Sequence, residues 1–410
     1  MKNEIDRLMR ENDLAALLVV GSTDHNPHMV YFTGGRQVSD ADLIKPAGRK
    51  PVLYHFPMER DEAAASGLKT INYNKYHFMD LFKQAKGNEI RFRTLLYQKV
   101  FTDLGLIKGR ILIYGRTDAG YAYELAKSIR KALPGIEIVG DVNEAVLPVA
   151  MLTKDADEIS HIRSMGSITT GVVARTAEFL TSHKAKNGRL VKKDGQALTI
   201  GEVKRCINLW LAEAGVENPE GTIFSIGRDA AIGHTAGASG DELSLGKTIA
   251  FDIFPCEALG GFYYDFARTW CLGYAPDDVQ QLYDDVKRVY DTVVSELRIN
   301  GSCAQYQHRT CELFAARGHP TLEQDPQTID GYYHSLGHGI GLNVHERPHF
   351  NFTSDDRLVK GSTFAIEPGL YYPEREMGVC IEDSYCVTPE GKIEILADYP
   401  YDLVLKIKGH

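Results

Sequence analysis

The sequence predicts two domains that both combine helices with strands: a small α/β domain over residues 1–152 and a larger α+β domain over 153–410. A chain of 410 residues exceeds one ordinary hydrophobic core, so two domains are expected. Helical and strand patterns alternate in the first part, as in α/β domains. The second part contains two segments with the pattern of antiparallel hairpins, and each carries a pair of acidic residues.

The first domain is expected to begin with an amphipathic helix, marked by Ile5, Leu8 and Met9, which the apolar strand 14–20 follows. Two strands, a helix and a last strand are then predicted over 51–56, 110–114, 118–133 and 136–139. Pro134 and Gly135 end the predicted helix. This order of elements is typical of a small α/β domain.

The second domain is expected to begin with a helix that Thr153 caps and that runs to about residue 180, since acidic residues after a cap favour a helix start. Residues 183–197, rich in Lys and Gly, are predicted to form a loop. Thr199 and Glu202 form a capping box for a helix over 200–214. The remaining predicted elements are strands over 222–270, helices over 276–299 and 305–317, and mostly strand and loop over 331–405.

The acidic pairs of the two hairpins point to a metal site. Folding the first segment about the midpoint of residues 256–261 places Asp252 opposite Asp265. Folding the second about the midpoint of 372–377 places Glu367 opposite Glu382. Directly opposed residues have Cβ atoms about 5 Å apart, where like charges are destabilising. The flanking residues are apolar and predict burial, which makes an unpaired carboxylate costly. Two such pairs indicate divalent cations, because carboxylate oxygens are ligands that these ions prefer.

A glycine- and histidine-rich stretch lies between the two hairpins and reads HSLGHGIGLNVHE from His334 to Glu346. Its glycines let backbone and ligands approach closely, and they favour a loop or a bent strand over a helix. Its histidines can supply a metal ligand and substrate contacts. The alternative for any one of them is a hydrogen-bonded histidine of the core.

These motifs resemble the creatinase/prolidase/aminopeptidase P group of pita-bread metallopeptidases. The resemblance is specific over about residues 155–400, in the segments YDFART, GHGIGLNVHE, IEPG and IED, and loose over 1–150. It implies an N-terminal domain of the creatinase/prolidase type and a C-terminal pita-bread domain with a curved antiparallel sheet and helices. The family's order of metal ligands, Asp, Asp, His, Glu and Glu, maps onto Asp252, Asp265, His338, Glu367 and Glu382.

The resemblance also implies an activity. Members of this group hydrolyse the bond before proline in Xaa-Pro dipeptides or short peptides, by a hydroxide that bridges two metal ions. Glu367 would be the general base, and His345 and His234 would stabilise the oxyanion and the leaving group. His234, His334 and His345 are the implied substrate-binding residues. Oxygen ligands with one imidazole suit Mn²⁺, which we expect, with Co²⁺, Fe²⁺ or Zn²⁺ as alternatives.

Two departures from the family pattern are visible. Asp252 and Asp265 are thirteen residues apart, two more than the usual eleven, and an even insertion in the turn keeps both side chains on one face. Cys380 stands where the family usually has Arg, on the strand face expected for Glu382. The loss of this cation predicts an altered substrate preference. Arg347 and Arg375 are the nearest candidates in sequence to replace it, as partners of a substrate carboxylate or of Asp383.

Composition limits the possible partners. The net charge of −9 and the lack of a basic stripe argue against nucleic acid, and no run of eighteen apolar residues predicts a membrane span. Seven scattered cysteines without a Cys-x-x-Cys pair, and an N-terminus unlike a signal peptide, favour a reduced, cytoplasmic protein. We expect a homodimer that acts on a small peptide or another small molecule.

Two other functions fit the same residues. The metal site can act on a non-peptide substrate, as a C–N hydrolase or a sulfonium lyase, and Cys380 is the feature that favours this reading. A non-catalytic binding module is the third reading, although all five expected ligands are present.

Overall fold

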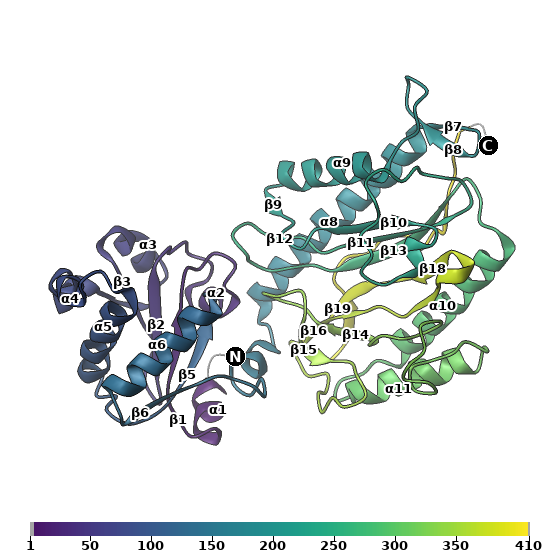
Figure 1. The fold of residues 1–410 in the computed structure, drawn as a ribbon. Helices are drawn as coiled ribbons and strands as arrows, with labels where there is room; N and C mark the ends of the chain where they lie inside the picture. The colour runs from purple at the N-terminus through teal and green to yellow at the C-terminus, as the bar shows by residue number, and fades with distance from the viewer. Residues whose placement is uncertain (1–3, 409–410) are drawn as a thin grey trace. The chain divides into compact units, whose positions relative to one another are not determined.

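The computed structural model describes residues 4–408, which form two compact units (Figure 1). The first unit is the chain up to Met151 together with Leu259–Gly261, and the second is Leu152–Ala258 with the chain from Phe262 onward. Among the described residues, none of the helices combines the length and the hydropathy that a bilayer crossing requires.

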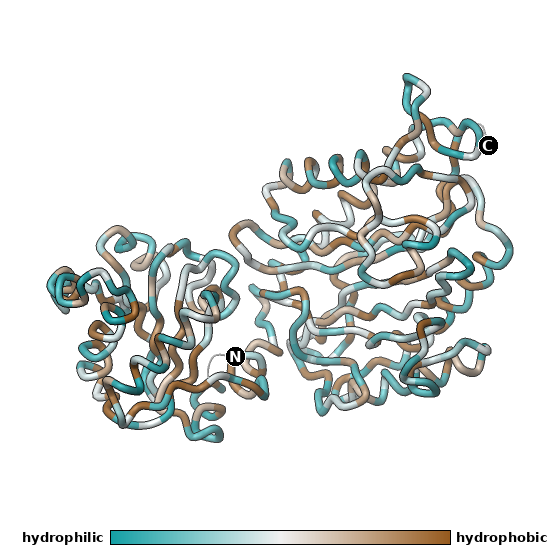
Figure 2. Tube along the Cα trace, viewed as in Figure 1, coloured by the Kyte–Doolittle hydropathy of each residue, from teal (hydrophilic) through white to brown (hydrophobic). Residues whose placement is uncertain are grey.

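The first unit is built around a six-stranded mixed sheet of order β4-β3-β2-β1-β5-β6. Its strands are β1 (Leu14–Val20), β2 (Ala41–Pro46), β3 (Val52–His55), β4 (Lys69–Asn72), β5 (Gly109–Gly115) and β6 (Ile136–Val139). Its helices are α1 (Ile5–Glu11), α2 (Pro27–Thr33), α3 (Arg60–Ala65), α4 (Phe78–Ala85), α5 (Glu89–Asp103), α6 (Ala119–Ala132) and α7 (Leu147–Met151). Hydrophobic residues concentrate along the central strands, which supply much of this unit's core (Figure 2).

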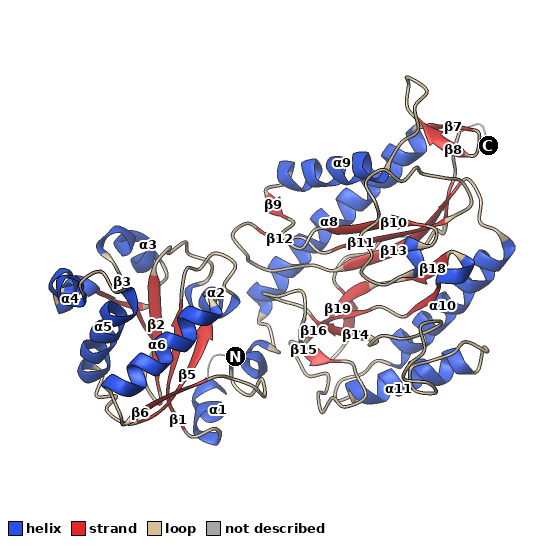
Figure 3. Ribbon diagram, viewed as in Figure 1, coloured by secondary structure: helices blue, strands red, loops and turns tan. Residues whose placement is uncertain are grey.

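The second unit contains four long helices and two larger sheets (Figure 3). The helices are α8 (Ala156–Ser182), α9 (Ile200–Glu213), α10 (Asp277–Glu296) and α11 (Cys303–Ala315). One sheet has the order β10 (Thr222–Ile226), β11 (Thr248–Ile253), β13 (Phe266–Leu272) and β21 (Val404–Leu405). The other has the order β15 (Glu346–His349), β14 (Gly337–Gly339), β16 (Thr363–Ile366), β19 (Asp383–Val387) and β20 (Ile393–Ile395).

Three two-stranded pairings complete the second unit: β7 (Lys184–Lys186) with β8 (Arg189–Val191), β9 (Val216–Glu217) with β12 (Cys256–Glu257), and β17 (Gly369–Tyr372) with β18 (Met377–Cys380). Helices α8 and α9 pack on β10, β11 and β13, where Trp210, Phe251 and Trp270 belong to one core. Helices α10 and α11 pack on strands of the other sheet in a second core. Helices α8 and α9 therefore cover the face of the first sheet that carries Phe251 and Trp270, and the opposite face is left for a site.

A short ladder joins the two larger sheets where the expected ligands lie. The amide of Glu382 donates to the carbonyl of Ala267 at 3.0 Å, and the amide of Ala267 donates back at 3.4 Å. The hydroxyl of Thr269 accepts from the amide of Cys380 at 2.9 Å. Strand β13 is thus held beside the chain that links β18 to β19.

The predicted register of the first hairpin was wrong by two residues. Asp252 pairs with Ala267 rather than with Asp265, which lies just before β13. The connection is not a symmetrical turn, because it contains β12, which pairs with β9, and Leu259–Gly261, which belong to the first unit. The error is an even number of residues, so Asp265 keeps the face of Asp252. In the second hairpin Tyr372 pairs with Met377, which is the predicted register.

Two local predictions in the second unit were also wrong. The capping residue of α8 is Asp155, which forms a capping box with Glu158, and not Thr153. Residues 183–197 are not all loop, since β7 and β8 form a hairpin there. The capping box of Thr199 and Glu202 is present at the start of α9 as predicted.

Candidate metal centre

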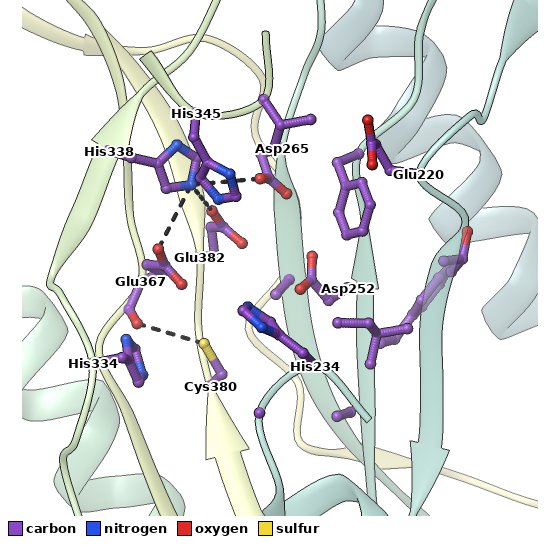
Figure 4. A pocket seen from close by; sticks show the side chains of 18 of the residues that line it. Glu220, His234, Asp252, Asp265, His334, His338, His345, Glu367, Cys380 and Glu382 are labelled. Atoms are coloured by element: carbon purple, nitrogen blue, oxygen red, sulfur yellow. Dashed lines mark hydrogen bonds and ion pairs between the residues drawn. The ribbon is translucent and has the colours of Figure 1, made fainter. Parts of the chain in front are cut away.

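A cavity of about 1150 Å³ lies within the second unit, and residues from both of its larger sheets line it. Its walls come from β10, β11 and the start of β13, from the segment around His234, from residues 333–351, and from the β17–β18 hairpin. Figure 4 shows the side chains that point into it. The structure brings all eight sequence-predicted site residues to this cavity: Asp252, Asp265, His234, His334, His338, His345, Glu367 and Glu382.

Three of these side chains converge closely. Ligand atoms of Asp265, His338 and Glu382 all lie within 4.8 Å of one another. The Nε2 atom of His338 lies 3.6 Å from Oδ2 of Asp265, 3.6 Å from Oε1 of Glu367 and 3.8 Å from Oε1 of Glu382. Asp252 is close enough to Asp265 for the two carboxyl groups to influence each other's pKa.

The backbone fixes this convergence. His338 is held in β14 opposite Ala365 of β16, and Glu367 directly follows β16 with its amide donating to Leu336 at 2.8 Å. A Cβ at Gly337 would lie 2.0 Å from the carbonyl oxygen of Ala365, which explains the glycine next to His338. On the other wall, the hydroxyl of Ser384 donates to the carbonyl of Asp265 at 2.9 Å.

His338 faces the acids as a neutral imidazole. Its Nδ1 lies 3.0 Å from the carbonyl of Gly339, so Nδ1 carries the proton and donates it. Burial, together with the charge of the neighbouring His345, lowers the pKa of His338 to about 3. The Nε2 lone pair therefore points at three carboxyl groups, and His338 cannot neutralise any of them at neutral pH.

The four carboxyl groups lack a cationic partner within the described chain. Asp265 and Glu382 are 4% and 2% exposed, and among residues 4–408 no Lys or Arg forms an ion pair with any of the four. Oδ1 of Asp252 and Oε1 of Glu382 are buried without a hydrogen-bond partner. Burial raises the pKa of Asp252 to about 7 and, with the charge of Asp252, that of Glu367 to about 8. Burial and the neighbouring acids also raise the pKa values of Asp265 and Glu382.

This donor set fits divalent metal ions. Four carboxyl groups and one imidazole lone pair face the same cavity, two of the oxygens have no hydrogen-bond partner, and no Lys or Arg among the described residues pairs with them. Buried unpaired charges are otherwise strongly destabilising. Hard oxygen donors with a single imidazole are the ligands of Mn²⁺, Fe²⁺, Co²⁺ or Zn²⁺.

Three further histidines surround the acids. The ring of His345 lies 4.3 Å from that of His338 between centroids, and burial lowers its pKa. Burial lowers the pKa of His334 to about 4; its Nδ1 lies 2.8 Å from the carbonyl of Ser335, and its Nε2 is buried without a partner. His234 has a positive φ of 62°, in the segment whose Gly233 amide donates to the hydroxyl of Tyr333. These histidines offer hydrogen-bond donors and acceptors to a ligand.

Cys380 lines the same cavity as Glu382, as its strand position predicted. Its thiol lies 3.6 Å from the carbonyl oxygen of Glu367, and burial raises its pKa, so it remains protonated. The two arginines proposed to replace the family's Arg do not line the cavity. Arg347 binds Asp355 and Asp356, and Arg375 lies 3.7 Å from Asp278.

Asp383 has a different partner from those predicted, namely Arg268. The guanidinium of Arg268 donates to Oδ1 of Asp383 at 2.8 Å and to the carbonyl of Glu382 at 2.8 Å. Both side chains are at most 1% exposed. The sequence offered one signal for this pair. Arg268 lies three residues after the expected ligand Asp265, and Asp383 directly follows the expected ligand Glu382.

Two charged residues of the cavity wall were not predicted from the sequence: Glu220, before β10, and Lys204, on α9. Neither lies in a recognisable motif. The packing of α9 on the first of the two larger sheets brings Lys204 to the cavity, and Glu220 lies in the segment that leads into β10.

Comparisons with known proteins agree with this geometry. The sequence model of metallopeptidase family M24 matches residues 160–389, more than half of the chain. A Mycobacterium tuberculosis protein named "Probable dipeptidase PepE" is 29% identical over 260 residues, 63% of this chain and 62% of that protein. The match thus spans less than two thirds of the length of this relative. The Xaa-Pro dipeptidase of Pyrococcus furiosus is 26% identical over 397 residues, 95% of this chain and 97% of that protein.

Solved structures share the whole fold. A crystal structure of a dipeptidase from Pyrococcus horikoshii OT3 superposes with a TM-score of 0.74 over 98% of this chain and 99% of that chain, at 21% identity. The prolidase from the same organism gives a TM-score of 0.72. These neighbours confirm the predicted fold class, a mixed α/β chain with a pita-bread domain. The chain belongs to metallopeptidase family M24, whose members use divalent metal ions.

Proposed function

We propose that this protein is a metal-dependent peptidase that binds two divalent ions and hydrolyses the bond before proline in Xaa-Pro dipeptides or short peptides. The observation that carries the proposal is a group of four largely buried carboxyl groups near one neutral histidine, with none of them paired to a Lys or Arg among the described residues. Family membership and full-length similarity to a protein named Xaa-Pro dipeptidase support it.

The five residues proposed to hold the ions are Asp252, Asp265, His338, Glu367 and Glu382. Four carboxylates carry a charge of −4, which two divalent ions balance. Bound at this site, the ions would lower the pKa of a coordinated water toward neutral and polarise the substrate carbonyl. Mn²⁺ is the ion that we propose, with Co²⁺, Fe²⁺ and Zn²⁺ as alternatives.

The chain's own side chains carry the proton transfers. Glu367, with a side chain that is 25% exposed, faces the cavity as a general base for the attacking water. His345 and His234 line the same cavity and can donate N–H groups to the oxyanion and the leaving nitrogen. His334 presents an unpartnered Nε2 acceptor to a substrate donor.

Proline after the scissile bond has a chemical consequence. That peptide bond is tertiary and offers no N–H, so a site that relies on donation from this group cannot hold it. Histidine side chains and a thiol in the cavity wall can bind the rest of the peptide without such a donor.

The test is a substrate panel with the Mn²⁺-loaded protein: Xaa-Pro dipeptides, Xaa-Pro-Yaa tripeptides, the same peptides with Ala in place of Pro, and small non-peptide amides. We expect the proline peptides to give the highest kcat/KM. Turnover of non-peptide amides alone would favour a C–N hydrolase instead, a reading to which Cys380 gives weight.

A further inference from the structure

The cavity holds few positive charges for its size. Among the described residues that line it, the only Lys and Arg side chains are Lys204 and Arg268. Arg268 is 1% exposed, and its donors are committed to Asp383 and to the carbonyls of Ala267, Glu382, Tyr399 and Pro400. Arg268 cannot turn toward a ligand without leaving Asp383 buried and unpaired.

Lys204 is in the opposite situation. It projects from the first turns of α9 and is half-buried. Its Nζ donates a hydrogen bond to the carbonyl oxygen of Ala236. No carboxylate of the described chain pairs with it, and burial lowers its pKa without an opposing acid. An ammonium group has three donors, so Lys204 retains donors and an uncompensated charge at the cavity wall.

Among the charged residues that line the cavity, Lys204 is the cation best placed to attract an anionic ligand. When two divalent ions balance the four carboxylates, the fixed charges left on the lining are the acid Glu220 and the base Lys204, apart from the internally paired Arg268. A short peptide brings an α-carboxylate into the cavity, and desolvating that group without a partner is costly. Arg347 and Arg375 bind acids elsewhere and do not line the cavity.

We propose that Nζ of Lys204 binds the C-terminal carboxylate of the peptide substrate and so sets a preference for peptide acids of a defined length. The proposal rests on the proposed peptidase function. It takes over the role that the sequence had suggested for Arg347 or Arg375.

A purely structural role for Lys204 predicts something different. Ala236 lies two residues after His234, and Gly237 packs so closely on Phe224 that a Cβ there would lie 2.4 Å from its carbonyl oxygen. If the role of Lys204 were purely structural, its bond to Ala236 would serve to hold the segment that carries His234. Loss of that tether would slow the turnover of every substrate, whatever the charge of its C-terminus.

The experiment compares peptide acids with their C-terminal amides. Ala-Pro and Ala-Pro-Ala, each as acid and amide, are assayed with the wild-type protein and with Lys204→Met, Lys204→Arg and Arg205→Met, all loaded with Mn²⁺. Arg205 is the matched control, because it is the next residue of α9, is exposed and does not line the cavity. We expect Lys204→Met to lower kcat/KM about 10- to 100-fold for one of the two peptide acids, the dipeptide or the tripeptide, whichever has the length that places its carboxylate at Lys204. The loss should appear mainly in KM, as for a lost hydrogen bond to a charged group. Amides and Arg205→Met should change less than about two-fold, and Lys204→Arg should restore most of the acid preference.

An equal loss for acids and amides, or no loss at all, would overturn the proposal while leaving the peptidase function intact. Binding by calorimetry in the Glu367→Gln background gives a readout that does not depend on turnover. Acid-selective binding that Lys204→Met removes supports the carboxylate site even if no peptide is hydrolysed, in which case the proposed function alone fails. Equal binding of acid and amide to the parent protein, or binding of neither, overturns the carboxylate site.

Discussion

Glu382 and Asp383 are neighbours in the sequence, both are at most 2% exposed, and they have opposite electrostatic environments. Asp383 receives hydrogen bonds from Arg268 at 2.8 Å, from Tyr290 at 2.5 Å and from Tyr401 at 2.8 Å. Oε1 of Glu382 has no hydrogen-bond partner, and three other acids lie around it. Successive residues of an extended chain point to opposite sides, so one acid enters the packed protein and the other enters the cavity.

The difference separates a structural charge from a functional one. Arg268 compensates Asp383 within the chain and also stacks on Phe266 and Tyr401, with distances of 4.3 and 4.4 Å to the ring centroids. The acids around His338 have no Lys or Arg partner among the described residues, so their charge is available to bound cations. The two acids should therefore respond in opposite ways to neutralising substitutions and to metal removal.

The largest expected effect is on catalysis. Glu367→Gln should lower kcat about 10²–10⁴-fold, because an amide cannot accept a proton as a general base does. The fold should be retained, as judged by circular dichroism and thermal unfolding. Steady-state kinetics on the best proline peptide provides the measurement, and more than about a tenth of the wild-type kcat would remove Glu367 from this role.

A matched pair of substitutions compares the two environments directly. Asp383→Asn should lower the free energy of unfolding by about 3–5 kcal/mol, because it leaves Arg268 as a buried unpaired charge. Asp252→Asn should raise the Tm of the EDTA-treated protein, because it relieves repulsion among buried acids. Thermal and urea unfolding without metal test both. If both variants shift in the same direction, the contrast between the two environments is wrong.

The pH dependence of the metal effect follows from the raised pKa values. Asp252 and Glu367 have folded-state pKa values near 7 and 8, above the unfolded values of about 4. Their stabilising contribution is complete below about pH 4 and is lost as pH rises through 7 and 8. The Tm of the EDTA-treated protein should therefore fall from pH 5.5 to pH 8, and added Mn²⁺ should raise Tm more at pH 8. An Mn²⁺ effect that is independent of pH would contradict this.

The smallest expected effect concerns Cys380. Its thiol adjoins Glu367 where relatives usually carry a guanidinium. Cys380→Arg should raise kcat/KM for Xaa-Pro dipeptides several-fold relative to other substrates, since Arg holds carboxylates in a bidentate way. Cys380→Ser serves as the size-matched neutral control. An unchanged substrate ranking with intact metal content would show that residue 380 does not set specificity.

The second hairpin was predictable because its turn is short and central. The register of Tyr372 with Met377 follows from the apolar alternation, and it brings Glu367 and Glu382 to one end. The register of the first hairpin could not be predicted, because β12 and Leu259–Gly261 interrupt the connection between its strands. The pairing of β12 with β9 is a long-range contact that no local sequence pattern indicates. Asp252 and Asp265 still reach the same cavity, since the error was an even number of residues.

Other features depend on tertiary packing and were beyond the sequence. Lys204 and Glu220 carry no motif, and only the docking of α9 shows that Lys204 faces the cavity. The pairing of Arg268 with Asp383 joins residues 115 positions apart. In the first unit, the strands β2 and β4 escaped prediction because their short segments have no clear alternation.

The acids around His338 are proposed to bind divalent metal ions, and the metal content of the protein tests this most directly. Protein purified with added Mn²⁺ should contain close to two ions per chain by elemental analysis. Asp265→Ala should lose at least one ion, whereas Cys380→Ser, in the same cavity but outside the proposed ligands, should keep both. Full metal occupancy in Asp265→Ala, or a wild-type protein without bound metal, would contradict the account.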